Sequence, residues 1–429
     1  MNLKIHKCEK FSIICDNIAS DKSISHRVAI FSLLSNKPSF VRNYLQGDDT
    51  LHTLQIAQML GLNVAEYDGG LILTPPDKIQ EPCDVLDCGN AGTAIRLYMG
   101  LLSSQKGMFV LSGDRYLNKR PMKRIISPLK SIGATIYGRE DNNYAPIVIH
   151  GGHLESFNYT SEISSAQVKS AMILAALFAK DSCIYSEYEL SRDHTERMLV
   201  GMGAEIENMD NNTIKINPLK EKLKPIEIEI PSDPSSAFFF AVAVSIIPDS
   251  RCILKNVLLN KTRIEAFKAL EKMGVIINYK ETSNIYDSIG DIEIISPSEL
   301  CAVDIRDNIS WLIDEIPALA VALSCANGTS SVRNAKELRV KESDRISSIV
   351  NNLKKCGIEV EELEDGFVIT GGIPRYAKVD SFGDHRIAMS FAILGLKCGI
   401  DIEDSDCISV SFPNFVEILK QITRIECEG

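Results

Sequence analysis

The sequence predicts an α/β protein of two pseudo-symmetric domains, each built from three repeats of helix and strand. The chain has 429 residues, which exceeds the size of one ordinary hydrophobic core. An amphipathic helix that ends in glycine recurs along the chain, and a second, more apolar helix alternates with it. Helices that alternate with short apolar strands are typical of α/β folds.

The amphipathic helices each end at a glycine and are followed by an apolar strand. Five segments show this pattern: TLHTLQIAQMLGLNV, PMKRIISPLKSIGATI, HTERMLVGMGAEI, RIEAFKALEKMGVII and RISSIVNNLKKCGIEV. Their glycines are spaced 70 to 83 residues apart, at Gly61, Gly133, Gly203, Gly274 and Gly357. Glycine favours the left-handed conformation just beyond a helix, so each should terminate its helix. A sixth copy, FPNFVEILKQITRIE, lacks the glycine and predicts a different helix end.

The alternating helices are rich in Ala, Leu and Ile, which predicts that they are buried. Six segments belong to this type: SHRVAIFSLLS, TAIRLYMGLLS, AQVKSAMILAALFA, SSAFFFAVAVSI, EIPALAVALSCA and HRIAMSFAILGL. Six long repeats do not fit a short-period solenoid, but they fit two domains of three repeats each. The Lys- and Pro-containing stretch 219–236 separates the third copy from the fourth, so we expect the division there.

Composition excludes several classes of protein. The formal net charge of −11 disfavours a broad nucleic-acid surface. No apolar run is long enough for a membrane span, and the N-terminus lacks a signal peptide, so we expect a cytoplasmic protein with no membrane partner. Twelve cysteines without a C-x-x-C pair predict reduced thiols. Neither of the common glycine-rich phosphate loops is present, so a nucleotide fold has no support.

Basic residues gather at the starts of the predicted helices. The buried helices begin near Lys22, Arg27, Arg96, Lys169 and Arg386, and the amphipathic helices begin near Arg120, Arg192, Lys341 and Arg345. A helix N-terminus attracts anions, and arginine binds phosphate and carboxylate with two parallel hydrogen bonds. The pattern therefore predicts a cleft for anionic groups. The alternative, left open for each residue, is a surface charge paired with a nearby carboxylate.

Two carboxylates belong to the same pattern. Asp314 precedes a buried helix, and Glu342 lies between Lys341 and Arg345, whose spacing of four predicts one shared helix face. A carboxylate among cations stays ionised and can act as a base, although Asp314 could instead be a plain helix cap.

Three of the seven histidines also fall in these motifs: His26, His194 and His385. Histidines in such positions are more often satisfied by local hydrogen bonds than catalytic. The other four show no spacing typical of metal ligands.

Seven segments in order resemble the 3-phosphoshikimate 1-carboxyvinyltransferase (EPSP synthase) family: DKSISHR, GNAGTAIR, NKRPM, SSAQVKSA, SRDHTE, LRVKESDR and GDHRIAMS. The resemblance runs from about residue 20 to residue 415. Within the family, the sequence is similar to the branch called class II. It implies two domains of three βαβαββ-type repeats, an inside-out α/β barrel. Residues 19–227 would form one domain, residues 1–18 and 228–429 the other, with the active site in the cleft between them.

The resemblance also implies a reaction: transfer of the enolpyruvyl group of phosphoenolpyruvate to the 5-hydroxyl of shikimate 3-phosphate, with release of phosphate. No metal or redox cofactor is required. Shikimate 3-phosphate would be bound by Lys22, Ser23, Arg27, Ser165, Ala166, Gln167 and Arg192. Phosphoenolpyruvate would be surrounded by Gly92, Arg120, Lys341, Arg345 and Arg386. Lys22, Asp314 and Glu342 would be catalytic, with Asp314 taking the hydroxyl proton and Glu342 exchanging the proton at the methylene carbon.

The sequence departs from one branch of the family at Leu97 and Ser411, where that branch has Pro and Lys. Gly92 leaves room for glyphosate, a phosphoenolpyruvate mimic, which predicts a glyphosate-sensitive enzyme.

The sequence fits three other classes of protein less well. The sister transferase acting on UDP-N-acetylglucosamine usually carries a loop cysteine, yet no cysteine lies between Cys88 and Cys183. A non-catalytic anion-binding repeat protein or an RNA-binding module is disfavoured by the acidic balance and the few aromatics near the basic motifs. No coiled-coil pattern is present, so we expect a monomer.

Overall fold

The computed structural model describes residues 1–210 and 212–428. The chain divides into two compact units, each described by itself. Unit 1 comprises Met1–Ala19, Pro231–Asn284 and the chain from Ser288 onward, and unit 2 comprises Ser20–Ile230 and Ile285–Asp287. Among the described residues, no helix has the length and apolar character needed to cross a membrane.

Unit 2 contains three four-stranded sheets. Their strands, in spatial order, are β14 (Glu227–Glu229), β3 (Ser39–Arg42), β5 (Gly70–Thr74) and β4 (Asn63–Tyr67); β6 (Leu86–Asp87), β7 (Gly107–Ser112), β9 (Tyr144–Gly151) and β8 (Thr135–Gly138); and β10 (Asn158–Ser161), β11 (Cys183–Glu187), β13 (Thr213–Ile216) and β12 (Ile206–Asn208). The helices are α1 (Lys22–Ser32), α2 (Asp48–Met59), α3 (Gly92–Leu102), α4 (Lys123–Ser131), α5 (Arg139–Asn142), α6 (Ala166–Ala176) and α7 (His194–Gly201), with a 3₁₀ turn at Leu117–Lys119.

Unit 1 has the same construction. Its sheets are β2 (Ser12–Cys15), β15 (Arg251–Leu258), β17 (Ile289–Ile295) and β16 (Ile276–Ser283); β18 (Asp304–Ile305), β19 (Thr329–Val332), β21 (Gly366–Thr370) and β20 (Glu359–Leu363); and β22 (Ala377–Asp380), β23 (Ile400–Glu403), β1 (Asn2–Ile5) and β24 (Ile425–Glu428). Its helices are α8 (Pro234–Ile246), α9 (Glu265–Lys272), α10 (Ile309–Leu312), α11 (Ile316–Ser324), α12 (Arg345–Lys355), α13 (His385–Cys398) and α14 (Phe415–Leu419), with 3₁₀ turns at Lys336–Val340 and Ser405–Val410.

The predicted repeat is confirmed as an edge strand, a buried helix, a strand, an amphipathic helix and two further strands. Each sheet has one parallel pair, such as β10 with β11, and two antiparallel pairs. Three of the repeats need a strand from elsewhere in the chain. Strand β14 completes the first sheet, β2 pairs with β15, and β1 inserts between β23 and β24.

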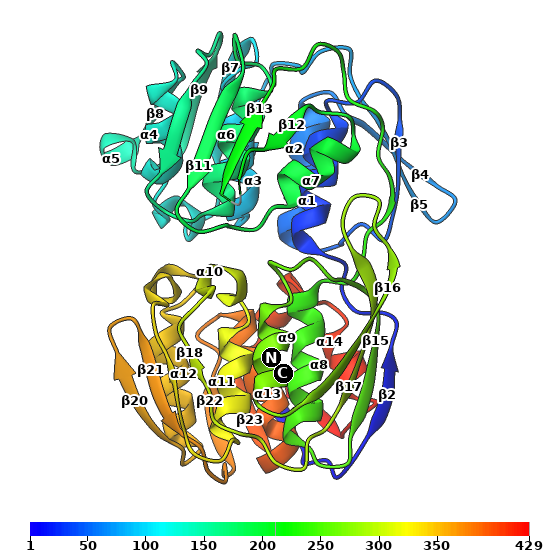
Figure 1. Cartoon of the computed structure of the whole chain (residues 1–429), viewed down its shortest axis with the longest axis vertical. Coiled ribbons are helices and arrows are strands. Elements are labelled where there is room, and N and C mark those ends of the chain that lie inside the picture. Colours follow the sequence, from blue (N-terminus) through cyan, green and yellow to red (C-terminus); the bar gives the residue numbers. More distant parts are fainter. Residues whose placement is uncertain (211, 429) are drawn as a thin grey trace. The chain divides into compact units, whose positions relative to one another are not determined.

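The buried helices form the centre of each unit. In unit 1, α8, α11 and α13 contact one another, and sheets flank them on the outside (Figure 1). Every residue of α8 is buried, including Phe238, Phe239 and Phe240. A helix that is apolar on all sides requires this enclosed position. The start of each helix is therefore the part that can present polar side chains.

The glycines predicted to end the amphipathic helices occupy that position. Gly61, Gly133, Gly203, Gly274 and Gly357 each lie two residues beyond the last helical residue and have φ between 78° and 104°. After α2, the Leu62 N–H donates to the Ala57 carbonyl at 2.9 Å, which closes the helix end. Any residue with a Cβ would be strained there.

Candidate active-site residues in the two units

Helix α1 begins with the first cationic motif of unit 2. Asp21 caps the helix by accepting the Ile24 N–H at 2.7 Å. Lys22 follows as the first helical residue and forms an ion pair with Asp49 of α2. The cap therefore holds a lysine at the helix start, where the positive end of the helix dipole adds to its charge.

Arg27 of α1 is a buried junction between three segments. Its Nε donates to Thr195 Oγ1 at 2.8 Å, its Nη2 to Ser170 Oγ at 2.9 Å, and its Nη1 to the Ser23 carbonyl at 3.0 Å. Arg192 lies two residues before α7, in the same segment as Thr195. The structure thus joins α1, α6 and the start of α7 around one guanidinium.

A second cluster lies at the starts of α3 and α6. Arg96 Nη1 donates to Gln167 Oε1 at 2.6 Å, and Gln167 Nε2 donates to Thr93 Oγ1 at 3.1 Å. Arg120 Nη2 donates to Asn90 Oδ1 at 2.9 Å. These contacts bring together side chains from three motifs that lie far apart in sequence.

Gly92 lies where the two arginines of this cluster approach the backbone. A Cβ at Gly92 would be 3.0 Å from Arg96 Nη1 and 3.2 Å from Arg120 Nη1, closer than ordinary van der Waals contact. Ser165 is the N-cap residue of α6 and Ala166 its first residue. The start of α3 therefore lies close to two guanidinium groups.

In unit 1, Arg345 at the start of α12 binds three carboxylates. Its Nη2 lies 2.6 Å from Glu342 Oε2, its Nε lies 2.8 Å from Asp384 Oδ2, and its Nη1 lies 3.5 Å from Asp314 Oδ1. The Arg345 side chain is 1% exposed, whereas Glu342 and Asp314 are 28% and 20% exposed. The two predicted catalytic carboxylates are therefore both bound to one buried cation and are themselves partly exposed.

Asp384 ties this cluster to α13. Its side chain accepts the Arg386 N–H at 2.9 Å as the helix cap and the Ser343 hydroxyl at 3.1 Å. Arg386 Nη1 in turn donates to the Asp314 carbonyl at 3.1 Å. Three motif segments, around residues 314, 343 and 385, are thus connected.

The opposite charges of Arg345 and Asp384 each favour the charged form of the other. Burial disfavours the charged form of Arg345, but the carboxylates of Asp384 and Glu342 outweigh it and raise the pKa of the guanidinium. Burial also acts to raise the pKa of Asp384, but Arg345 outweighs it and leaves that pKa lowered. Both groups are therefore held in their charged forms.

One prediction about this region is wrong. Lys341 and Arg345 do not share a helix face, because α12 begins at Arg345. Asp344 caps the helix by accepting the Ser347 N–H at 3.1 Å, which places the helix start after Lys341. Lys341 instead follows a 3₁₀ turn with extended backbone and pairs with Glu337 at 3.1 Å.

His26 is a structural residue. Its Nδ1 lies 2.6 Å from Thr53 Oγ1, and burial together with the nearby charge of Lys22 lowers its pKa to about 3. The imidazole is therefore neutral at physiological pH. Its Nδ1 has the expected local hydrogen-bond partner, whereas its buried Nε2 has none among the described residues.

Among the described residues, one group has the ligand spacing of a metal site: Asp193, His194 and Asp287, whose ligand atoms lie within 4.8 Å of one another. Arg197 Nε donates to Asp193 at 2.7 Å, and its Nη1 lies 3.9 Å from Asp287. A permanent cation thus already lies beside both carboxylates, and a metal ion would meet like charge. We assign this group to an ion-pair network.

Several side chains in these clusters were missed from the sequence. They are Asp49, Asn90, Thr93, Ser170, Thr195 and Asp384. Asn90, Thr93, Ser170, Thr195 and Asp384 lie inside the motifs quoted above, so their position in the sequence was a usable signal. Asp49 lies outside every motif, and no local pattern points to it.

Comparisons of the sequence and the fold with known proteins identify one family. The sequence matches the EPSP synthase (3-phosphoshikimate 1-carboxyvinyltransferase) family over residues 13–419. It is 58% identical over 426 residues to the 3-phosphoshikimate 1-carboxyvinyltransferase of Campylobacter concisus, covering 99% of both chains. It is 60% identical over 420 residues to that of Wolinella succinogenes, covering 97% and 96%. The structure of EPSP synthase from Acinetobacter baumannii matches with a TM-score of 0.89 at 35% identity, covering all of both chains.

The six βαβαββ repeats and the charged clusters at their helix starts define an α/β enzyme of the enolpyruvyl transferase type. The chain belongs to the EPSP synthase family. Its activity is that of a 3-phosphoshikimate 1-carboxyvinyltransferase, in aromatic amino acid biosynthesis. The family binds shikimate 3-phosphate and phosphoenolpyruvate.

Proposed function

We propose that Asp314 and Glu342 are the proton-transfer groups of the reaction. Asp314 removes the proton of the 5-hydroxyl as that oxygen bonds to C2 of phosphoenolpyruvate. Glu342 donates a proton to C3, which gives a tetrahedral intermediate. Elimination then breaks the bond from C2 to the phosphate oxygen, and Glu342 takes a proton back from C3. The departing phosphate takes the proton held by Asp314, which restores both carboxylates. Lys22 is proposed as the cation near the reacting centre.

The contact of both carboxylates with Arg345 is the observation that carries this proposal. One guanidinium lies 2.6 Å from Glu342 and 3.5 Å from Asp314, so both side chains are oriented by the same buried group. Both are partly exposed, which a group that touches substrate requires. General acid–base catalysis depends on this combination of fixed geometry and access.

We propose that the cationic helix starts bind the anionic substrates. Shikimate 3-phosphate is assigned to Lys22, Ser23, Arg27, Ser165, Ala166, Gln167 and Arg192, and phosphoenolpyruvate to Gly92, Arg120, Lys341, Arg345 and Arg386. The hydrogen bonds of Arg27 to Ser170 and Thr195 support the first group, since they hold its guanidinium against α6 and α7. The approach of Arg96 and Arg120 to Gly92 supports the second.

Deuterium incorporation tests the proton-transfer roles. With shikimate 3-phosphate and phosphoenolpyruvate in D₂O, Glu342→Gln should lower kcat ~10²- to 10⁴-fold and abolish deuterium incorporation at C3, followed by NMR. Asp314→Asn should lower kcat over a similar range. The exposed Glu361→Gln in the same unit is the matched control for loss of one charge. Deuterium incorporation at the wild-type rate in Glu342→Gln would remove this residue from the chemistry.

Phosphate release in EDTA, with shikimate 3-phosphate or UDP-N-acetylglucosamine offered separately, tests both the acceptor and the need for a metal. We expect release with shikimate 3-phosphate alone. Undiminished activity under micromolar glyphosate at limiting phosphoenolpyruvate would contradict the proposed glyphosate sensitivity.

We further propose that the protein acts as a monomer in the cytoplasm, where its twelve cysteines remain thiols. We also propose that residues 19–227 form one functional domain, and that residues 1–18 with 228–429 form the other. Sedimentation of the purified chain tests the first of these statements.

A further inference from the structure

Lys169 lies in the first turn of α6, beside the proposed shikimate 3-phosphate residues Ser165 and Gln167, but it is buried. Its side chain is 2% exposed, and its Nζ lies 2.8 Å from Glu187 Oε1 and 3.0 Å from Glu196 Oε1. Burial acts to lower the pKa of Lys169, but the two carboxylates outweigh it and raise that pKa. Buried ion pairs contribute little net stability compared with apolar packing, so stability alone does not account for this cluster.

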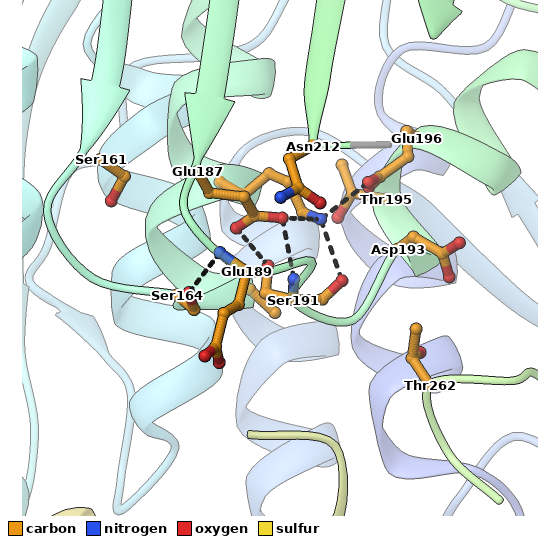
Figure 2. Close-up of polar contacts among 12 residues, drawn as sticks. Ser161, Ser164, Glu187, Glu189, Ser191, Asp193, Thr195, Glu196, Asn212 and Thr262 are labelled. Atoms are coloured by element: carbon orange, nitrogen blue, oxygen red, sulfur yellow. Dashed lines mark hydrogen bonds and ion pairs between the residues drawn. The ribbon is translucent and has the colours of Figure 1, made fainter. Parts of the chain in front are cut away.

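The cluster encloses Ser191, the residue immediately before Arg192. Glu187 Oε1 accepts the Ser191 N–H at 2.8 Å, and Glu187 Oε2 accepts the Ser191 hydroxyl at 2.8 Å. Lys169 Nζ donates to the Ser191 carbonyl at 3.1 Å. Figure 2 shows Glu187 reaching Ser191, with Glu196 on the other side of the cluster. Every polar group of Ser191 is therefore bound by one buried ion pair.

The next residue of α6 holds the other end of the same segment. Ser170 Oγ lies 2.7 Å from Thr195 Oγ1, and both hydroxyls accept hydrogen bonds from Arg27. Two successive residues of α6 thus bind the segment 191–195 before and after Arg192. These contacts hold the segment that carries Arg192 against α6.

We propose that Lys169 and Glu187 are positioning residues for shikimate 3-phosphate, acting through Ser191 on Arg192. This inference rests on the proposed binding roles of Arg192 and Arg27. Neither Lys169 nor Glu187 needs to touch the substrate. A misplaced Arg192 would weaken substrate binding but would leave the catalytic groups in place. Loss of Lys169 or Glu187 should therefore lower the affinity for shikimate 3-phosphate.

Steady-state kinetics of Lys169→Met tests the proposal. The substitution keeps a long unbranched side chain but removes the charge and the bond to the Ser191 carbonyl. We expect KM for shikimate 3-phosphate to rise ~10- to 100-fold, with kcat and KM for phosphoenolpyruvate nearly unchanged. Ser191→Ala, which removes only the hydroxyl bond to Glu187, should give a smaller rise in the same direction and keeps the test open if Lys169→Met does not fold.

Two controls separate the possible outcomes. Leu174→Ala removes a buried side chain five residues further along α6, hence on another face, and tests whether general destabilisation raises the same KM. Arg192→Ala tests the underlying assignment. An unchanged KM in Lys169→Met and Ser191→Ala, with a raised KM in Arg192→Ala, would overturn the positioning role alone. An equal rise in Leu174→Ala would also overturn it. An unchanged KM in Arg192→Ala would instead overturn the proposed binding role.

Discussion

Both units bury a cation among carboxylates, but the carboxylates differ in what else they contact. In unit 2, Lys169 pairs with Glu187, which is 1% exposed. Glu187 also accepts hydrogen bonds from the backbone N–H and the hydroxyl of Ser191. In unit 1, Arg345 pairs with Glu342 and Asp314, which are partly exposed. The buried Lys169 thus contacts the segment that contains Ser191, whereas the buried Arg345 contacts carboxylates that are partly exposed.

The direction of the pKa shifts separates the two clusters further. Asp384 beside Arg345 has a lowered pKa, because the guanidinium outweighs the effect of burial. Glu196 beside Lys169 has a raised pKa, because burial outweighs the lysine and Asp193 adds repulsion. The forked guanidinium contacts several carboxylates with separate nitrogens, whereas one ammonium group must divide its interaction.

The largest expected effect comes from Arg345→Met. It leaves three carboxylates without their buried partner, so the free energy of unfolding should fall by ~3–5 kcal/mol and kcat by at least ~10²-fold. Urea unfolding and steady-state kinetics measure the two losses. The matched control is Arg333→Met, which breaks an exposed pair with Asp365 and should cost about 0–1 kcal/mol. Equal losses in both variants would contradict the central role of Arg345.

An intermediate effect concerns the dependence of stability on pH. The ionised Asp384 is favoured by folding, so its contribution is present above its unfolded-state pKa of about 3.9 and is lost as pH falls through the lower native pKa. The destabilisation caused by Asp384→Asn should therefore be constant near neutral pH and shrink in acid.

Glu196 should show the opposite dependence. Its native pKa is raised, so the folded state loses stability as pH rises from the unfolded-state value of about 4.3 through the native value. Glu196→Gln removes this loss, and its stability relative to the native chain should improve as pH rises. Thermal unfolding between pH 3 and 8 measures both variants, and parallel pH profiles would erase the distinction between the clusters.

The smallest expected effect comes from Gly92→Ala. The added methyl group would press on the guanidinium groups of Arg96 and Arg120, which would have to move by a few tenths of an ångström. We expect a severalfold rise in KM for phosphoenolpyruvate and weaker inhibition by glyphosate, at a cost of about 1 kcal/mol or less in stability. Ala91→Gly, one residue earlier, is the control. Unchanged KM and inhibition in Gly92→Ala would separate this position from the phosphoenolpyruvate site.

Much of the fold was predictable because its determinants are local. A glycine two residues beyond a helix stops it whatever surrounds it, so Gly61 and Gly357 could be assigned from the sequence. The apolar helices could likewise be assigned to the core. The shared helix face of Lys341 and Arg345 was predicted wrongly, since spacing alone cannot show that Asp344 caps the helix between them.

The sequence by itself determined the repeat, the helix ends, the buried helices and the family. Only the tertiary structure decided which strands complete the repeats, since β1, β2 and β14 pair with partners distant in the chain. It also decided which charges meet. Lys169 and Glu187 are 18 residues apart and Arg345 and Asp384 are 39 apart, and no local spacing predicts such contacts. Helix ends depend on short-range backbone geometry, whereas buried ion pairs depend on how elements that are separated in the chain pack together.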